Sequence, residues 1–363
     1  MEANRIRGVL APVVTPFQND LSPDQERLIR HCKWLLSQNC GLAVFGTNSE
    51  ANSMSAEERM MLLDALVAAG IDPARMMPGT GCCSISETVE LTAHAVKHGC
   101  AGVLMLPPFY YKNVSEEGLY AYFSEVVQCV GDTRLRIYLY HIPPVAVVGI
   151  TPKLVERLLQ AYPTAIAGMK DSSGDWNNTT MFLDSFVETA RPSPIAGAAR
   201  TFDVFVGSES VRAGLADSFD GPPGNDADTD GGFDVFVGSE SFLLANMRHG
   251  GAGTISATAN VNPAAIYSLF AKARDEAGPP SREASARLDL EGQQAKLNVV
   301  REVFARKSWP SMIAALKQAI AIYGNDPEWA RVRPPLVEFT TEQARKLAVE
   351  LEKIEFSIKL VER

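Results

Sequence analysis

The chain has 363 residues, of which 46% are hydrophobic and 21% are charged, an ordinary composition for a globular protein. That composition supplies enough apolar side chains to bury a large core. The 34 lysine and arginine residues against 43 aspartate and glutamate residues give a net charge of −9, and an acidic surface of this kind argues against a nucleic-acid partner.

Short apolar runs alternate with helix-like segments along most of the chain. The runs are nearly continuous in apolar residues, as strands covered on both faces should be. Eight predicted strands follow in order: Gly8–Val14, Leu42–Phe45, Met76–Pro78, Gly102–Leu106, Arg136–Tyr140, Ile166–Met169, Asp234–Val237 and Gly253–Ser256. Five of the helix-like segments between them are Asp24–Gln38, Ala56–Ala69, Ser86–His98, Glu116–Val130 and Thr151–Ala161.

Several of these helices carry start signals. Ser55 and Ser115 each precede two glutamates, which places a capping hydroxyl and acidic residues at the helix N-terminus. Thr151-Pro152 fits a cap followed by proline at the first helical position.

Eight strands that each lead into a helix predict an α/β fold of the TIM (β/α)8 barrel type. The competing arrangement, a doubly wound open sheet, usually has a glycine-rich turn after its first strand. Here that strand runs into Thr15-Pro16-Phe17, so the barrel is favoured.

The character of the chain changes after Pro279-Pro280. Residues 283–306, 311–323 and 341–355 are predicted helices, and a strand over Val332–Phe339 is weakened by its prolines. We therefore expect a barrel over residues 1–280 and a C-terminal helical extension over 281–363.

The string Phe-Asp-Val-Phe-Val-Gly-Ser-Glu-Ser occurs twice, at Phe202–Ser210 and at Phe233–Ser241. A barrel has room for one seventh strand, and the second copy leads into a convincing helix, so we assign the strand to it. The first copy then belongs to a flexible insertion over about residues 198–232, rich in Gly, Asp and Pro. Asp226–Gly231 resembles the opening of a calcium loop, but we interpret it as a solvated acidic loop because position twelve falls on Val237.

Active sites of TIM barrels lie at the carboxyl ends of the strands. Lys170 ends the sixth predicted strand, and alternation should point it into the barrel mouth, where lost hydration favours a nucleophilic amine. A plainer alternative is an ion pair with Asp171 or Asp175. Tyr140 ends the neighbouring strand and is suited to passing protons to and from the lysine, and Thr47 is placed to hydrogen-bond that phenol. The other strand-end candidates for the site are Asn48, Tyr110, Tyr111, Gly238 and Ile255.

Other signals favour plain structural interpretations. Gly79-Thr80-Gly81 indicates a tight turn after the third strand, and His141 should face away from Tyr140 as a packed histidine. The six cysteines, which show no paired Cys-x-x-Cys spacing, are expected to be reduced thiols and to hold no metal. Met1 to Arg5 lacks the pattern of a secretory signal, and no apolar run reaches roughly 18 residues, so we expect a cytoplasmic protein without a membrane partner.

Five motifs in this order and spacing resemble the dihydrodipicolinate synthase/N-acetylneuraminate lyase superfamily, over about residues 5–350 apart from the insertion. They are Gly46-Thr47-Asn48-Ser49-Glu50, Leu106-Pro107-Pro108-Phe109-Tyr110-Tyr111-Lys112, Tyr140-His141-Ile142-Pro143, Gly168-Met169-Lys170-Asp171 and Gly253-Thr254-Ile255-Ser256-Ala257-Thr258-Ala259-Asn260. The resemblance implies class I aldolase chemistry, in which a lysine forms a Schiff base with pyruvate or a related 2-oxo acid.

Carried over residue by residue, the resemblance makes Lys170 the Schiff-base lysine and Tyr140 the proton-relaying tyrosine. It makes Thr47 the hydroxyl that links Tyr140 to a second tyrosine, Tyr111, which reaches in from the adjacent subunit. Thr47 and Asn48 would hold the 2-oxo acid carboxylate, and the Ile255 carbonyl would face the substrate. Gly238, at the end of the preceding strand, is a further substrate-binding candidate from its position alone. The resemblance also implies a homotetramer built as a dimer of dimers.

One departure separates the chain from the synthases of this superfamily. They carry an arginine two residues after the Tyr-x-x-Pro motif, which holds the carboxylate of the second substrate, and here Pro144-Val145 stands there. Asn48, and Asp171 after the lysine, also resemble the aldolase side of the superfamily. The sequence therefore predicts a lyase that makes or breaks a C–C bond between a 2-oxo acid and an aldehyde, without metal or organic cofactor.

Three other functions stay open at this stage. A dihydrodipicolinate synthase would condense pyruvate with aspartate semialdehyde and would hold that substrate by other residues. A non-catalytic barrel would bind 2-oxo acids without forming a covalent adduct. A pyridoxal-phosphate enzyme using the same lysine would absorb visible light when purified, but the sequence shows no phosphate-binding cup.

Overall fold

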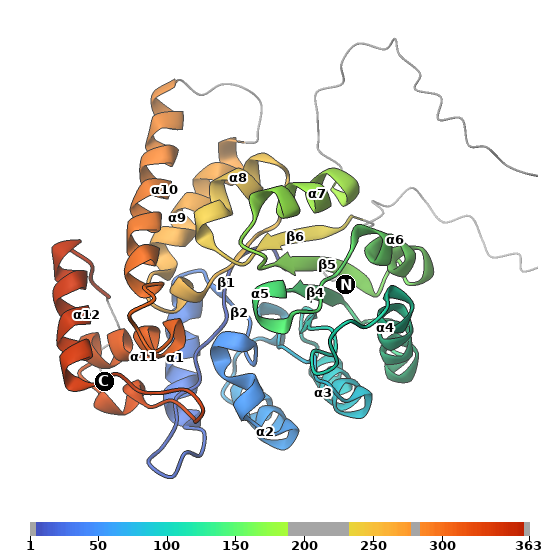
Figure 1. Ribbon diagram of the computed structural model, residues 1–363, viewed down its shortest axis with the longest axis horizontal. Coiled ribbons are helices and arrows are strands. Elements are labelled where there is room, and N and C mark those ends of the chain that lie inside the picture. The colour runs from blue at the N-terminus through green and yellow to red at the C-terminus, as the bar shows by residue number, and fades with distance from the viewer. Residues whose placement is uncertain (1–4, 188–231, 277–283, 359–363) are drawn as a thin grey trace, which may run out of the picture.

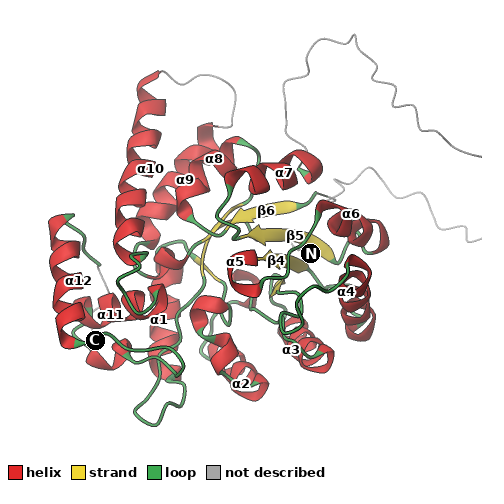
Figure 2. Cartoon of the chain, viewed as in Figure 1, coloured by secondary structure: helices red, strands yellow, loops and turns green. Residues whose placement is uncertain are grey.

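The computed structural model of the protein describes residues 5–187, 232–276 and 284–358. Its described strands form one parallel sheet in the order β2-β1-β7-β6-β5-β4-β3. The strands lie at the centre of the molecule and the helices surround them (Figure 1, Figure 2). The strands are β1 (Gly8–Ala11), β2 (Gly41–Leu42), β3 (Val103–Met105), β4 (Ile137–His141), β5 (Ile166–Asp171), β6 (Asp234–Val237) and β7 (Gly253–Ile255).

The α-helices alternate with these strands and then continue without them. They are α1 (Gln25–Ser37), α2 (Ala56–Ala68), α3 (Ile85–His98), α4 (Glu116–Val130), α5 (Pro143–Ala146), α6 (Pro152–Ala161), α7 (Trp176–Phe186), α8 (Leu243–Arg248), α9 (Pro263–Glu276), α10 (Ala284–Phe304), α11 (Met312–Tyr323) and α12 (Thr341–Lys353). Short 3₁₀ turns include η1 (Thr47–Ser49), η4 (Glu240–Phe242) and η5 (Ala257–Asn260). None of the helices within the described ranges is both long and apolar enough to cross a membrane.

Residues 76–80 close the sheet into a barrel. Met76 forms a parallel bridge with Leu42, and Gly79 forms one with Leu104, so this segment joins the two edge strands β2 and β3. The predicted third strand is therefore present as isolated bridges, and each of the other seven predicted strands overlaps an observed one. The fold is an α/β TIM barrel, as the alternation of strands and helices predicted.

Two apolar clusters show which way the strand residues face. The larger cluster combines outward strand residues such as Val103, Leu139 and Val235 with side chains of the surrounding helices. The smaller one draws on strands all round the barrel and fills its interior. Its buried members are Ile6, Leu10, Ala43, Met77, Leu104, Tyr138, Tyr140, Ala167, Phe236, Ala252 and Ile255.

A one-residue bulge lies between β4 and β5. Ile137 pairs with Ile166, but the next residue, Tyr138, pairs with Gly168, so β5 carries one extra residue. Strict alternation from the outward-facing Ile166 would turn Lys170 outward as well. The bulge shifts the phase, leaving Met169 in the outer cluster and Lys170 beside the inward-facing Tyr140. The predicted direction of Lys170 holds, but simple alternation was the wrong reason for it.

The predicted helix caps are confirmed. Ser55 accepts a hydrogen bond from the Glu58 amide in a full capping box, and Ser115 accepts one from the Gly118 amide. Thr151 caps α6, with Pro152 as its first residue. These caps satisfy amides that the first helical turn leaves without partners.

The second copy of the repeat supplies β6, which pairs with β5 and β7 as predicted. The first copy, the calcium-like loop Asp226–Gly231 and nearly all of the insertion at 198–232 lie outside the described residues. Toward the C-terminus the helices α10, α11 and α12 match the three predicted ranges closely and stand on one side of the barrel (Figure 1). Residues 332–339 contain no strand.

The bulge generates a stability prediction at Gly168. A Cβ added there would lie 2.2 Å from the Asp234 carbonyl oxygen and 2.9 Å from the Tyr138 ring, so the backbone must shift. We expect Gly168→Ala to lower the free energy of unfolding by about 1–3 kcal/mol, measured by urea denaturation. The matched control is Gly292→Ala on α10, where nothing lies within 4 Å and alanine should be neutral or stabilising. Equal stability of the Gly168→Ala variant and the wild type would contradict the described packing of the bulge.

Candidate active site

Lys170 and Tyr140 lie opposite each other on β5 and β4, at the carboxyl ends of these strands. The lysine is 4% exposed and the tyrosine 3%. Lys170 Nζ lies 3.3 Å from the Tyr140 hydroxyl oxygen and 4.3 Å from the centre of its ring. The bulge described above thus gives a buried amine with a phenol as its hydrogen-bond partner.

Thr47 completes this group from the end of β2. Its Oγ1 lies 3.4 Å from the Tyr140 hydroxyl oxygen, so the phenol stands between a threonine hydroxyl and an amine. Burial alone would raise the pKa of Tyr140, but the Lys170 charge and hydrogen bonds from Thr47, Lys170 and Ser172 outweigh burial and hold it below its ordinary value. A phenol with a lowered pKa, hydrogen-bonded on both sides, is suited to moving protons.

The expected acidic partners of Lys170 are engaged elsewhere. Asp171 accepts a hydrogen bond of 2.6 Å from the Thr179 hydroxyl, and Ser173 also donates to it. Asp175 caps α7 by accepting from the Asn177 amide. Within the described ranges, neither carboxylate forms an ion pair with Lys170. The structure therefore does not support the ion-pair alternative.

The turn η1 holds Thr47 and Asn48 above the end of β2. Asn48 is half-buried, and among the described residues neither backbone amide of this pair donates a hydrogen bond. A small cavity reaches from this turn to Tyr140. It is lined by Phe45, Gly46, Thr47, Ala51, Asn52, Gly79, Gly81, Leu104, Leu106 and Tyr140. Free amides beside a cavity offer donors to an anionic group.

Gly79 and Gly81 owe their identity to close packing around this cavity. A Cβ at Gly79 would lie 2.3 Å from the Phe45 carbonyl oxygen, and one at Gly81 would lie 2.3 Å from the Leu106 amide nitrogen. The sequence suggested a tight turn here. The structure shows instead an extended segment that packs between β2 and β3, with bridges from Met76 to Leu42 and from Gly79 to Leu104.

Gly238 and Ile255 lie at the carboxyl ends of β6 and β7. Ile255 is fully buried in the inner cluster that also holds Tyr140. A Cβ at Gly238 would collide with the Ser172 hydroxyl, because the Gly238 amide donates a hydrogen bond of 2.6 Å to the Asp171 carbonyl. Gly238 thereby keeps the end of β6 close to the segment that follows Lys170.

Tyr111 is the predicted site residue that the single chain does not bring to the others. It is 73% exposed and stacks edge-on against Tyr110, with ring centroids 5.2 Å apart. Among the described residues it makes no hydrogen bond to Thr47 or Tyr140. The structure thus joins Lys170, Tyr140 and Thr47, and leaves Tyr111 at the surface.

Two buried contacts with the C-terminal helices hold the loops of this site, and sequence reasoning missed both. Glu50, which follows η1 in a left-handed conformation, accepts from Lys317 Nζ of α11 at 2.6 Å and from the Arg333 amide at 2.8 Å. The side chains of Glu50 and Lys317 are both fully buried, and burial lowers the pKa of Lys317 to about 8 although Glu50 opposes this shift. The only signal in the sequence is a lysine inside the apolar run of α11.

The second contact fixes the turns that follow β6 and β7. Glu240 is 1% exposed, accepts from the hydroxyls of Ser256 and Thr258, and pairs with Arg301 of α10 at 2.9 Å. A buried carboxylate with a charged and two neutral donors is well satisfied. It ties the turn η5 after Ile255 to α10.

His141 packs as expected, away from Tyr140. Its Nδ1 accepts a hydrogen bond of 2.9 Å from the Ile150 amide, and its ring lies against Phe182. Burial lowers its pKa, which favours the neutral imidazole. Histidine here is a structural residue.

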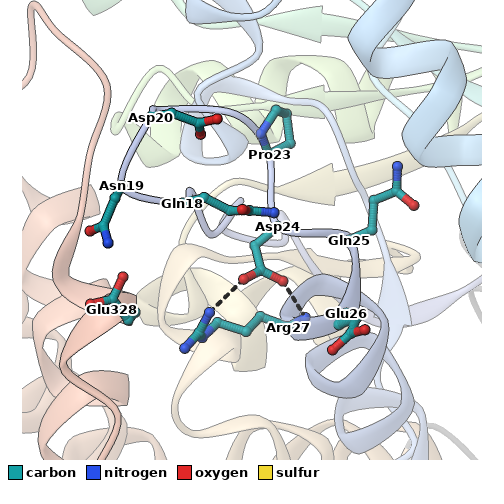
Figure 3. Close-up of a pocket in the computed structure, with 9 residues that line it drawn as sticks. All are labelled: Gln18, Asn19, Asp20, Pro23, Asp24, Gln25, Glu26, Arg27 and Glu328. Atoms are coloured by element: carbon teal, nitrogen blue, oxygen red, sulfur yellow. Dashed lines mark hydrogen bonds and ion pairs between the residues drawn. The ribbon is translucent and has the colours of Figure 1, made fainter.

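A wider pocket lies away from this site, at the start of α1 (Figure 3). It is lined by Gln18, Asn19, Asp20, Pro23, Asp24, Gln25, Glu26, Arg27 and Glu328. Its one cationic side chain, Arg27, already pairs with Asp24 and Asp326. None of the predicted site residues lines this pocket, so it is not the candidate active site.

Comparison with known proteins gives a consistent result. The model of the Dihydrodipicolinate synthetase family matches residues 5–190 and 226–354. An uncharacterized DapA-like lyase of Chloroflexus aurantiacus is 28% identical over 96% of this chain and 97% of its own. A 4-hydroxy-tetrahydrodipicolinate synthase of Thermus thermophilus is 31% identical over 94% of both chains. The crystal structure of dihydrodipicolinate synthase from Agrobacterium tumefaciens superposes with a TM-score of 0.72 at 27% identity, covering 96% of this chain and 99% of that one.

Proposed function

The chain belongs to the dihydrodipicolinate synthetase family, and on that premise we propose that it is an aldolase whose Lys170 forms a Schiff base with pyruvate or a related 2-oxo acid. One observation carries the proposal. A lysine amine at the carboxyl end of a barrel strand is 4% exposed, has no acidic partner among the described residues, and contacts a phenol at 3.3 Å.

The chemistry begins with attack of the Lys170 amine on the C2 carbonyl of the 2-oxo acid. Tyr140 donates a proton to the departing hydroxyl, water leaves the carbinolamine, and an imine forms. The Tyr140 phenolate then takes a proton from C3 to give an enamine, whose carbon attacks the carbonyl carbon of an aldehyde. The alkoxide that forms takes this proton back from Tyr140. Hydrolysis of the imine releases the product and regenerates the lysine. The imine nitrogen acts as the electron sink, so the reaction needs no metal or organic cofactor.

The other site residues are assigned by position. The free amides of Thr47 and Asn48 would bind the carboxylate of the 2-oxo acid, and the Thr47 hydroxyl would pass the Tyr140 proton onward. The Ile255 carbonyl and the Gly238 backbone would border the substrate at the neighbouring strand ends. In this arrangement Glu50 and Glu240 are positioning residues that act through the loops they hold.

A second candidate is a 4-hydroxy-tetrahydrodipicolinate synthase, the activity named for the Thermus thermophilus relative. That enzyme class condenses pyruvate with aspartate semialdehyde, whose carboxylate needs a cationic partner. Val145, which stands where such synthases carry arginine, is 62% exposed on α5 and cannot supply a charged hydrogen bond. We therefore favour an aldehyde without that carboxylate.

We further propose that the protein is a homotetramer in which Tyr111 enters the site of a neighbouring chain. Tyr110, Tyr111, Val145 and Val147 are large apolar residues that are 62–73% exposed. Lys112 Nζ donates to the Ala146 carbonyl at 3.1 Å, so the two loops that carry them are adjacent. An apolar surface of this kind is typical of an interface between subunits.

Borohydride trapping tests the Schiff base. Wild-type protein treated with pyruvate and borohydride should gain one reduced pyruvyl group, which intact mass and peptide mapping would place on Lys170. The Lys170→Arg variant should gain none. Tyr140→Phe keeps the amine and should form the adduct about 10²-fold more slowly or worse, since it lacks the proton donor. The proposal fails when folded wild-type protein gives no adduct with pyruvate or other 2-oxo acids.

The aldehyde preference is tested by steady-state assays with pyruvate and aspartate semialdehyde. Val145→Arg should lower the KM for aspartate semialdehyde about 10- to 100-fold, because a charge-assisted hydrogen bond contributes about 1.5–3 kcal/mol. The KM for pyruvate should not change. Val337→Arg, at an equally exposed position outside the proposed interface, is the control. A wild type that already uses aspartate semialdehyde more efficiently than neutral aldehydes would establish the synthase instead.

Sedimentation analysis tests the assembly. The wild type should sediment with four times the 39.4 kDa mass of one chain. The double variant Tyr110→Asp/Val147→Asp should dissociate, because it places two charges in the proposed interface. Val337→Asp, at a 65% exposed position in the C-terminal region, should remain tetrameric. A monomeric wild type would rule out the proposed role of Tyr111.

A further inference from the structure

A cluster of two histidines and one aspartate lies on the outer ring of the barrel, between α2 and α3. Asp64 belongs to α2, and His94 and His98 belong to α3. His94 Nε2 lies 2.8 Å from Asp64 Oδ1, and His98 Nε2 lies 2.6 Å from the same oxygen. The three ligand atoms all fall within 4.8 Å of one another.

The helices position these groups in advance of any ligand. His94 and His98 are four residues apart, which places them on one face of α3, one turn above the other. Their rings lie at 77° with centroids 4.7 Å apart, so both Nε2 atoms can face a common point without stacking. Asp64 approaches that point from the neighbouring helix, and its side chain is 54% exposed and free to adjust.

Hydrogen bonding alone accounts for only part of this arrangement. His98 forms a hydrogen bond with Asp64 Oδ1. His94 Nε2 is buried and close to the same oxygen, yet among the described residues it makes no hydrogen bond of acceptable direction. The His94 nitrogen therefore lies beside the carboxylate without a directed hydrogen bond, in a position from which it could bind a metal ion together with that carboxylate.

We propose that Asp64, His94 and His98 form a binding site for a divalent transition-metal cation such as Zn²⁺. Two imidazole nitrogens and one carboxylate oxygen are a usual donor set for zinc, with a fourth position open to water. Tetrahedral ligands about 2.0–2.1 Å from zinc lie roughly 3.3 Å apart, so each histidine nitrogen needs to move away from the Asp64 oxygen by less than about 1 Å. No metal was expected from the sequence, because His94 and His98 form no zinc-binding spacing with the cysteines and Asp64 lies on another helix.

The site is separate from the proposed chemistry. Lys170 faces the barrel interior, whereas this cluster lies between two helices of the outer ring. A bound ion would join α2 to α3 and stabilise the folded state, since a ligand that binds only the native protein raises its stability. Its presence or absence should leave Schiff-base formation unchanged.

Isothermal titration of Zn²⁺ into untagged, chelator-free full-length protein tests the site. The wild type should bind one ion per chain at this position. His94→Ala and His98→Ala should each weaken that binding by more than about tenfold, since even the loss of a residue that only supports a ligand costs 10- to 100-fold. Asp64→Asn, which keeps the side-chain shape, should weaken it in the same direction.

Two matched controls separate this site from other zinc ligands. His249→Ala removes an exposed histidine at the end of α8 and should leave the affinity unchanged. Cys82→Ser/Cys83→Ser removes two neighbouring thiols in the loop before α3 and should also leave the affinity unchanged. Zn²⁺ should raise the melting temperature of the wild type and of both controls, but not of the His94 and His98 variants. Unchanged affinity in those variants, or loss of binding in the cysteine variant, would overturn the proposal.

Discussion

The single extra residue that β5 carries against β4 decides which way Lys170 faces. Parallel strands in a barrel alternate between the interior and the helix layer, so a shift of one residue exchanges the two faces. Here the shift occurs at Gly168, where only glycine fits between the Tyr138 ring and the Asp234 carbonyl. Without it, Lys170 would face the helices, where an uncompensated amine is costly to bury. With it, the amine meets the Tyr140 hydroxyl.

Once Lys170 faces inward, the surrounding loops have to be held in place, and the C-terminal helices do this from outside. Lys317 of α11 reaches Glu50 behind η1, and Arg301 of α10 reaches Glu240 behind η5. Buried ion pairs contribute little net stability because desolvation offsets their attraction, but removing one partner leaves a costly unpaired charge. Their value here lies in fixing the turns that carry Thr47 and follow Ile255. The helices beyond the barrel are therefore part of the site's support.

The sequence was informative where the physics is local. Alternating runs and caps such as Ser55 and Thr151 located the strands and helices. The rule that barrel sites lie at the carboxyl ends of strands predicted that Lys170, Tyr140 and Thr47 lie together. The bulge at Gly168 was not predicted, because a glycine in a short apolar run is compatible with many local structures. The roles of Lys317 and Arg301 were not predicted either. Lys317 meets Glu50, and Arg301 meets Glu240, only after folding brings together residues far apart in the sequence. Tyr111 cannot be placed by one chain, because its proposed partners lie on another.

A crystal structure of the protein grown with pyruvate tests Lys170 as the Schiff-base residue most directly. Continuous electron density should run from Lys170 Nζ to C2 of the substrate. The substrate carboxylate should lie against the Thr47 and Asn48 amides, and the Tyr140 hydroxyl should lie within hydrogen-bond distance of the new bond. Pyruvate bound elsewhere, or bound in the barrel mouth without a covalent link to Lys170, would contradict that role of the lysine.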